Sequence, residues 1–111
     1  MSSKLNSTKI ITVEPNGHVS AANVREFQQQ LTAAVTSQGD SPLLIDMHGI
    51  EFLDSAGLMA LISAFSLAQS LGRPFILCSL APSIRMIFEL TQLDRVFEIF
   101  ESRDAVELAV S

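Results

Sequence analysis

Apolar residues along this chain form short continuous runs that alternate with longer stretches of helical spacing. The runs Leu43–Ile45 and Phe75–Cys78 are apolar at every position, which is typical of strands buried on both faces of a parallel sheet. Residues 8–14 are rich in β-branched side chains and predict a first strand. Residues 96–100 predict a short last strand.

The first strand is followed by Pro15, Asn16 and Gly17, which have the chemistry of a turn. Proline presets the backbone angle φ, and Asn-Gly tolerates positive φ. We therefore expect His18–Ser20 to pair back on the first strand, which gives an N-terminal hairpin.

Four stretches carry apolar residues three or four positions apart, as the buried face of a helix requires. Ser20 or Asn23 can cap the first of them, and Ser102 can cap the last. Gly72 is a stop signal for the second helix, and Ala81-Pro82-Ser83 starts the third. The apolar positions of the four helices are Val24, Phe27, Leu31, Ala34 and Val35; Leu58, Leu61, Ile62, Phe65, Ala68 and Leu71; Ile84, Ile87 and Phe88; and Ala105, Leu108 and Ala109.

This order of elements, β-β-α-β-α-β-α-β-α, predicts a single α/β domain that spans residues 1–111. The sheet is expected to be mixed but mostly parallel, with about four to five strands, right-handed crossovers and about four helices packed against it. Ile50, Phe52 and Leu53 are assigned to the loop that follows the strand ending at Asp46, and they are expected to pack beneath it.

Composition narrows the classes of function. Of the 111 residues, 48% are hydrophobic and 17% are charged, so the chain can build a core. The formal net charge is −5 and the seven basic residues are scattered, which argues against nucleic acid as a partner. The longest apolar stretch, residues 56–68, is shorter than the roughly 20 residues of a bilayer span, and the first residues lack the apolar core of a signal peptide. We therefore expect a cytoplasmic protein without membrane insertion.

The one cysteine, Cys78, lies in an apolar run and is expected to be an inert core thiol in a reducing compartment. The two histidines, His18 and His48, are far from it in the sequence, so the three residues make no metal-ligand pattern. The sequence also has no glycine-rich phosphate loop. It therefore predicts neither a metal nor a cofactor.

The segment Phe52–Leu58 carries the candidate chemistry, because it joins a predicted central strand to the second predicted helix. Ser55 is a natural N-cap for that helix, and Asp54 is the competing cap one residue earlier. The amino end of a helix carries about half a positive charge, so it would tolerate a phosphate on Ser55 with a charge of about −1.5 to −2. Such a phosphate would sharply change the potential of a docking surface. From the residues alone, a structural cap and a regulatory switch both remain open.

Gly57 falls in the first turn of the same helix, where glycine costs about 1 kcal/mol relative to alanine. A bare backbone here either lets another protein approach Ser55 closely or allows tight packing against the neighbouring loop. Met59, one turn beyond Ser55, is either a core residue or an exposed and adaptable interface residue.

Residues 43–58, which end in Asp54-Ser55-Ala56-Gly57-Leu58, resemble the signature of the STAS domain, named for sulfate transporters and anti-sigma factor antagonists. Leu77–Arg85 also looks like the strand-to-helix passage of this family, and the likeness covers nearly the whole chain. In particular, the chain resembles the bacterial anti-sigma factor antagonists.

The resemblance implies a partner-switching cycle and no catalytic activity in the chain itself. In that cycle the unphosphorylated antagonist binds an anti-sigma factor that is also an ATP-dependent serine kinase. The kinase, which binds the ATP, phosphorylates the antagonist and releases it, and a metal-dependent serine phosphatase resets the cycle. By position the phosphoacceptor is Ser55, and the expected partner-binding residues are Asp54, Ser55, Ala56, Gly57, Met59, Ser20 and Asn23.

One position departs from the family pattern. Members often carry Gly-x-Leu-Asp after the early hairpin, whereas this chain has Gly17-His18-Val19-Ser20. Ser20 in place of the acid bears on which kinase recognises the protein and on how efficiently Ser55 is phosphorylated.

Two other classes of function compete with this interpretation. Ser55, a histidine, and Asp46 or Asp54 include the residue types of a hydrolytic triad, but the first glycine of the Gly-x-Ser-x-Gly elbow is missing. The second class keeps the fold: related domains serve as accessory subunits of lipid transporters or as ligand-sensing modules that phosphorylation does not control.

Overall fold

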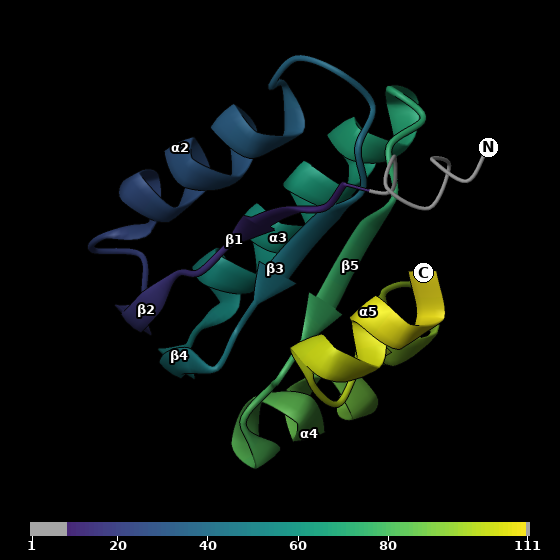
Figure 1. Cartoon of the computed structure of the whole chain (residues 1–111). Coiled ribbons are helices and arrows are strands. Elements are labelled where there is room, and N and C mark those ends of the chain that lie inside the picture. Colours follow the sequence, from purple (N-terminus) through teal and green to yellow (C-terminus); the bar gives the residue numbers. More distant parts are fainter. Residues whose placement is uncertain (1–8, 111) are drawn as a thin grey trace, which may run out of the picture.

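A four-stranded parallel sheet forms the centre of the molecule, and a smaller two-stranded sheet extends from one end of it (Figure 1). The structure is a computed structural model that describes residues 9–110. In the larger sheet the strands follow one another in chain order, and every neighbouring pair is parallel. These strands are β1 (Ile11–Val13), β3 (Leu43–Asp46), β5 (Phe75–Cys78) and β6 (Glu98–Phe100).

Each crossover steps to the next strand in the same direction, so right-handed connections place the crossover helices on one face of this sheet. These helices are α2 (Val24–Val35), α3 (Ser55–Ser70) and α4 (Pro82–Leu90), and a short 3-10 turn, η1 (Leu93–Arg95), follows α4. The last helix, α5 (Arg103–Val110), lies over the opposite face (Figure 1). Within residues 9–110 no helix has the length and apolar character needed to cross a bilayer.

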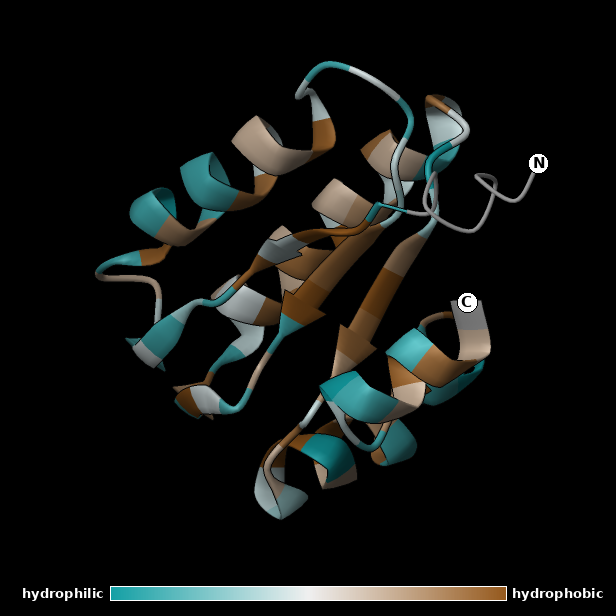
Figure 2. Cartoon of the chain, in the orientation of Figure 1, coloured by the Kyte–Doolittle hydropathy of each residue, from teal (hydrophilic) through white to brown (hydrophobic). Residues whose placement is uncertain are grey.

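The side chains of β3 divide between two apolar clusters, one on each face of the sheet. Leu43 and Ile45 lie in the larger cluster with α2, α3 and α4, and Leu44 lies in the smaller one with Val106 of α5. Leu43, Leu44 and Ile45 are at most 1% exposed, so the prediction of a strand buried on both faces is confirmed. Figure 2 shows the apolar strands at the centre of the molecule and the polar side of α2 turned outward.

The predicted N-terminal hairpin is wrong, although the fold class as a whole is confirmed. β1 pairs in parallel with β3, and the next strand, β2 (Asn16–Val19), pairs in parallel with β4 (Gly49–Leu53). Pro15, Asn16 and Gly17 therefore do not reverse the chain, and they lie where it passes from one sheet to the other. Local turn chemistry cannot reveal this arrangement, because the partner of each strand lies far away in the sequence.

Residues 50–53, which the sequence assigned to a loop, form most of β4. The alternation of buried and exposed residues is interrupted in this strand: Ile50 and Leu53 are buried, whereas Glu51 and Phe52 are exposed. The register of β2 against β4 shifts next to Gly17. Such a bulge breaks the period of two by which a strand is recognised, and this explains why the pattern was missed.

A buried arginine that the sequence did not single out holds the carboxyl end of α2. Arg73 is only 4% exposed and donates hydrogen bonds to the carbonyl oxygens of Val35 (3.0 Å), Ser37 (2.8 Å) and Ser41 (3.0 Å). Its positive charge also complements the negative end of the helix dipole. Gly72 precedes it with a φ of 72°, just beyond the end of α3, so the predicted stop of that helix is confirmed.

Candidate functional site

Ser55 is the first residue of α3, and its neighbour Asp54 caps the helix. One carboxylate oxygen of Asp54 accepts hydrogen bonds from the amides of Ala56 (2.9 Å) and Gly57 (3.1 Å). Of the two competing caps, Asp54 is the one with the extended backbone that a cap requires, with φ −95° and ψ −172°. Ser55 is exposed, and its hydroxyl has no hydrogen-bond partner among the described residues. Within the described residues, the Ser55 hydroxyl therefore makes no hydrogen bond that stabilises the fold.

Asp54 also ties the start of α3 to the loop that precedes α2. Its second carboxylate oxygen accepts a hydrogen bond from the amide of Ala21 (3.0 Å), and its own amide donates to the carbonyl of Val19 (3.1 Å). The hydrogen bond from the amide of Gly57, together with those from Ala21 and Ala56, holds the pKa of the Asp54 carboxyl below its ordinary value. The charged carboxylate of Asp54 therefore links the start of α3 to the loop that precedes α2.

Ser20 and Asn23 shape this loop from within instead of capping α2 through their side chains. Asn23 occupies the cap position of α2, but its side chain makes no hydrogen bond to the first turn. It accepts a hydrogen bond from the amide of Ser20 (2.8 Å) and donates one to the carbonyl of His18 (2.8 Å). The Ser20 hydroxyl accepts a hydrogen bond from the amide of Ala22 (3.3 Å). The structure thus holds the loop of residues 20–23 in a defined shape beside Asp54.

We expect Asp54→Asn to reduce the loss of stability that acid causes. A carboxyl whose pKa is lower in the folded state stabilises the fold fully above its unfolded pKa of about 3.9, and this contribution is lost as the pH falls through the folded value. Chemical unfolding of wild type and variant from about pH 7 to about pH 3 measures the difference. An identical pH dependence in both proteins would contradict this role of Asp54.

Gly57 is buried against the two-stranded sheet. A Cβ atom placed on it would lie 2.5 Å from Cδ1 of Leu53 and 2.9 Å from Cγ1 of Val19, which is closer than van der Waals contact allows. Of the two interpretations of this glycine, the structure supports tight packing. The absence of a side chain lets the first turn of α3 rest directly on β2 and β4.

Gly57→Ala should lower the free energy of unfolding by about 1–2 kcal/mol, because the cost of overpacking exceeds the gain of about 1 kcal/mol in helix propensity. Urea unfolding measures this change. Ser66→Ala, at an exposed position of the same helix, is the matched control. A Gly57→Ala variant as stable as wild type would contradict this prediction, and a variant more stable by about 1 kcal/mol would show that Leu53 moves aside without cost.

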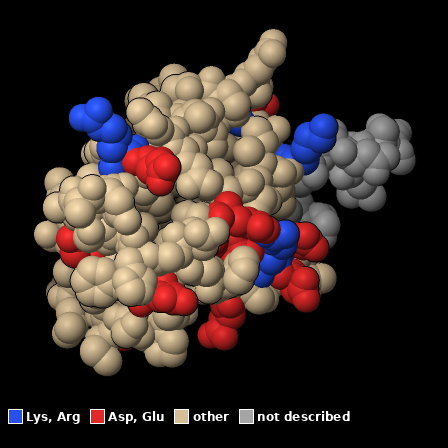
Figure 3. Space-filling view, turned by 90° about the vertical axis from the view of Figure 1, so that its left-hand side faces the viewer, with Lys and Arg blue, Asp and Glu red and all other residues tan. Residues whose placement is uncertain are grey.

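Apolar side chains are exposed both before and after Ser55 in the sequence. Phe52 on β4 is 50% exposed and Met59, one turn along α3, is 58% exposed, so Met59 is not a core residue. Figure 3 views the molecule from the side that carries β2 and the start of α2, and it shows broad areas without charged residues and one group of acidic residues gathered around a basic side chain. Farther along, α2 and α3 border a groove of about 650 Å³ lined in part by Ala60 and Leu67. The surroundings of Ser55 can therefore offer apolar contact area to another protein.

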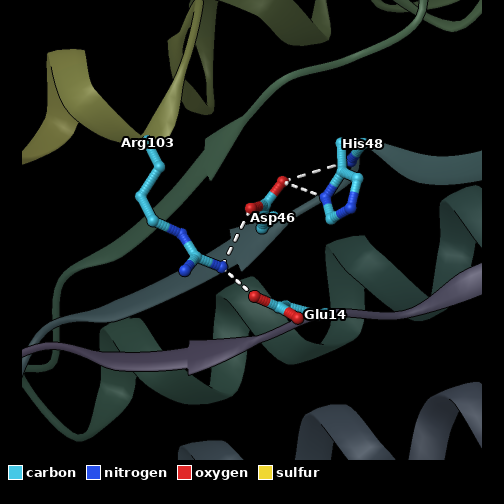
Figure 4. A network of polar contacts seen from close by, with 4 residues as sticks. All are labelled: Glu14, Asp46, His48 and Arg103. Carbon is cyan, nitrogen blue, oxygen red and sulfur yellow. Dashed lines mark hydrogen bonds and ion pairs between the residues drawn. The ribbon is translucent and has the colours of Figure 1, made fainter.

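A second polar cluster lies at the carboxyl ends of β1 and β3, where Arg103 of α5 reaches toward both strands (Figure 4). Nη2 of Arg103 donates to one carboxylate oxygen of Asp46 at 3.0 Å and also pairs with Glu14. The other oxygen of Asp46 accepts hydrogen bonds from the backbone amide (3.2 Å) and Nδ1 (2.9 Å) of His48. Burial raises the pKa of Asp46, but the hydrogen bonds from His48 and the charges of His48 and Arg103 outweigh it, and the pKa is lowered overall. The sequence missed this cluster because its members come from separate segments.

The hydrolytic triad considered above is not assembled in the described structure. His18 pairs with Glu51 at 3.1 Å, and His48 pairs with Asp46 at 2.9 Å. Neither histidine is bonded to Ser55, so neither is joined to it as a general base would be.

Cys78 is fully buried at the end of β5, and burial raises the pKa of its thiol. Both observations agree with the inert core thiol that the sequence predicts. Within residues 9–110 no group of three His, Cys, Asp or Glu side chains is arranged to hold a metal ion.

Comparison with known proteins assigns the chain to a family. The model of the STAS domain matches residues 4–106. A protein of Bordetella bronchiseptica with the name "Putative anti-sigma factor antagonist BtrV" is 32% identical over 94 residues, which are 84% of this chain and 79% of that protein. The chain therefore belongs to the STAS domain family.

Solved structures give the same fold. A structure from Thermotoga maritima, described as a putative anti-sigma factor antagonist, superposes with a TM-score of 0.82 at 20% identity and covers 91% of this chain and 86% of that one. An anti-sigma factor antagonist from Mycobacterium paratuberculosis superposes with a TM-score of 0.79 at 27% identity, covering 91% and 85% of the two chains. The resemblance seen in the sequence is confirmed, and these similar proteins carry the description of anti-sigma factor antagonists.

Proposed function

We propose that this chain is an anti-sigma factor antagonist that binds an anti-sigma factor with serine kinase activity and releases it when Ser55 is phosphorylated. The observation that carries the proposal is that Asp54, and not Ser55, caps the start of α3. Asp54 caps the helix, so the exposed hydroxyl of Ser55 is left without a structural role among the described residues. A group that the fold does not use can be modified without unfolding the protein.

The position of Ser55 favours a switch that acts on the docking surface. A phosphate at the first position of a helix meets the positive end of the helix dipole, so the helix itself is not opposed by the new charge. The same phosphate adds a charge of about −1.5 to −2 one residue after the carboxylate of Asp54, in a segment where Phe52 and Met59 are exposed. A partner seated on this apolar surface would have to bury that charge, and the complex would separate.

The loop of residues 20–23 belongs to the same docking surface in this proposal, because the amide of Ala21 is bonded to Asp54. Ser20, which stands where family members often carry an acid, removes one negative charge from this loop. We expect this loss to select a kinase whose surface does not require an acid there. Asn23 keeps the loop in shape through its bonds to Ser20 and His18.

The rest of the cycle follows from this assignment. The partner kinase binds the ATP, a metal-dependent serine phosphatase removes the phosphate from Ser55, and the antagonist itself catalyses neither step. All of these events would take place in the cytoplasm, without nucleic acid and without membrane insertion of this chain.

Incubation with the cognate serine kinase and labelled ATP tests the proposal. Wild type should accept one phosphate per chain, and Ser55→Ala should accept none. Ser66→Ala, at an exposed position farther along the same helix, should be labelled like wild type. Label on another residue, with Ser55 unmodified, would overturn the assignment.

Co-purification separates this function from that of a transporter subunit, which would use the same fold without phosphorylation. A serine kinase of the histidine-kinase-like type as the captured partner supports the switch. An ATP-binding cassette protein as the captured partner, bound equally well by wild type and Ser55→Asp, would support the transporter subunit.

A further inference from the structure

Two breaks separate the two-stranded sheet, which leads into the Ser55 site, from the larger sheet. β1 gives way to β2 at Glu14-Pro15, and β3 gives way to β4 at Met47-His48. Beyond the breaks, β2 leads into the loop of residues 20–23, and β4 leads into Asp54 and Ser55. The loop of residues 20–23 and the start of α3 therefore both follow strands of the two-stranded sheet.

The two breaks pack against each other. A Cβ atom on Gly49 would lie 3.0 Å from Cβ of Asn16 and 3.1 Å from the carbonyl oxygen of Pro15. Met47 is fully buried, and its amide donates a hydrogen bond to the carbonyl of Cys78 (2.9 Å). The two breaks thus form one packed junction. Contacts that fix this junction also fix the directions of β2 and β4, which follow it.

Arg103 of α5 binds both sides of this junction. Its guanidinium contacts Glu14, the residue after β1, and Asp46, the last residue of β3 (Figure 4). Asp46 in turn holds the amide and the ring of His48, the residue before β4, with its other oxygen. The side chain of Asp46 is only 7% exposed, so solvent screens its bond to Arg103 less than that of an open surface pair. One side chain of the last helix therefore connects to both breaks.

We propose that Arg103 is a positioning residue for the Ser55 site. It fixes the junction, and through β2 and β4 it fixes the loop of residues 20–23 relative to the start of α3. The importance of that site rests on the function proposed above, whereas the mechanical coupling concerns this chain alone. Contact of a partner with α5, or release of α5 from the sheet, would then change the Ser55 site without touching it.

Hydrogen exchange of backbone amides tests the coupling in the whole chain. In Arg103→Gln, we expect the amides of Ala21 and of residues 50–54 to exchange about fivefold faster or more, while Leu31 in α2 and Leu77 in β5 keep wild-type rates. Arg95→Gln, which removes an exposed arginine from η1, is the matched control and should leave all these rates unchanged. Arg103→Lys should restore part of the protection, because it keeps the positive charge that Glu14 and Asp46 share.

Two outcomes would overturn the proposal. One is unchanged exchange at Ala21 and residues 50–54 in Arg103→Gln, and the other is an equal acceleration over the whole chain, which reports a loss of global stability. Phosphorylation by the cognate kinase adds a second readout: Arg103→Gln should raise KM by a larger factor than it lowers kcat, because it displaces the docking surface and not the hydroxyl. If wild type is not phosphorylated, the proposed function fails, whereas the exchange result still decides the role of Arg103.

Discussion

Arg73→Leu is expected to lower the free energy of unfolding by about 3 kcal/mol or more, the largest change in stability that we predict. Arg73 is 4% exposed, and its guanidinium donates to the carbonyls of Val35, Ser37 and Ser41. Leucine fills much of the same space but offers no donor. Each buried carbonyl left without a partner costs about 1–3 kcal/mol, and the end of α2 loses the charge that complements its dipole.

Thermal and urea unfolding measure this effect, and for a domain of this size the loss corresponds to a fall in Tm of about 10 °C or more. Arg73→Lys should fall between wild type and Arg73→Leu, because its single ammonium keeps the charge but replaces two donor atoms, Nη1 at Val35 and Ser37 and Nε at Ser41. Arg95→Leu, at an exposed position, should change stability by less than about 0.5 kcal/mol. A loss below about 1 kcal/mol for Arg73→Leu would show that water replaces the guanidinium at these carbonyls.

Ser55→Asp is expected to weaken binding of the partner kinase by about 100-fold while leaving the fold intact. The new carboxylate follows Asp54 directly, in a segment where Phe52 and Met59 are exposed, so a docked partner must bury a second negative charge. A cost of about 2.7 kcal/mol corresponds to that factor. An acid in the first turn of a helix is favourable by a few tenths to about 1 kcal/mol, so stability should not fall.

Ser66→Asp is the control for charge alone, because Ser66 is exposed on the same helix, about 16 Å along its axis from Ser55. Titration of the kinase with the two variants should show a large loss of affinity for Ser55→Asp and little change for Ser66→Asp. Equal losses for both would indicate that the partner senses net charge and not the start of α3. A Ser55→Asp variant that binds like wild type would remove the electrostatic basis of the switch.

Elements with a strong local pattern could be predicted from the sequence. The continuous apolar run Phe75–Cys78 forms β5, and the hydroxyl of Ser102 accepts a hydrogen bond from the amide of Ala105 (3.1 Å) at the start of α5, as expected of a cap. The hairpin and the loop after Asp46 were wrong for one common reason. β2 and β4 are short strands that pair with each other across a bulge. The residues of each strand do not indicate which distant segment it pairs with.

The sequence predicted where α3 begins, but not the hydrogen bonds that hold this end of the helix. The motif around Ser55 marks the start of α3 correctly, but only the fold brings the amide of Ala21 to Asp54, from 33 residues away in the sequence. That bond uses the second carboxylate oxygen of Asp54, so the residue that caps α3 also binds the loop before α2. Arg103 was missed for the same reason, because Glu14 and Asp46 meet it only when β1, β3 and α5 come together.

A phosphosite map of the protein isolated from its own cells tests the central claim most directly. Mass spectrometry of the intact chain and of its peptides should find a single phosphate, located on Ser55, in a fraction of the molecules. The phosphorylated fraction should keep the Tm of the unmodified protein within about 2 °C, since the phosphate acts on the docking surface and not on the fold. A phosphate on another residue with Ser55 unmodified, or a phosphorylated form that unfolds, would contradict this account.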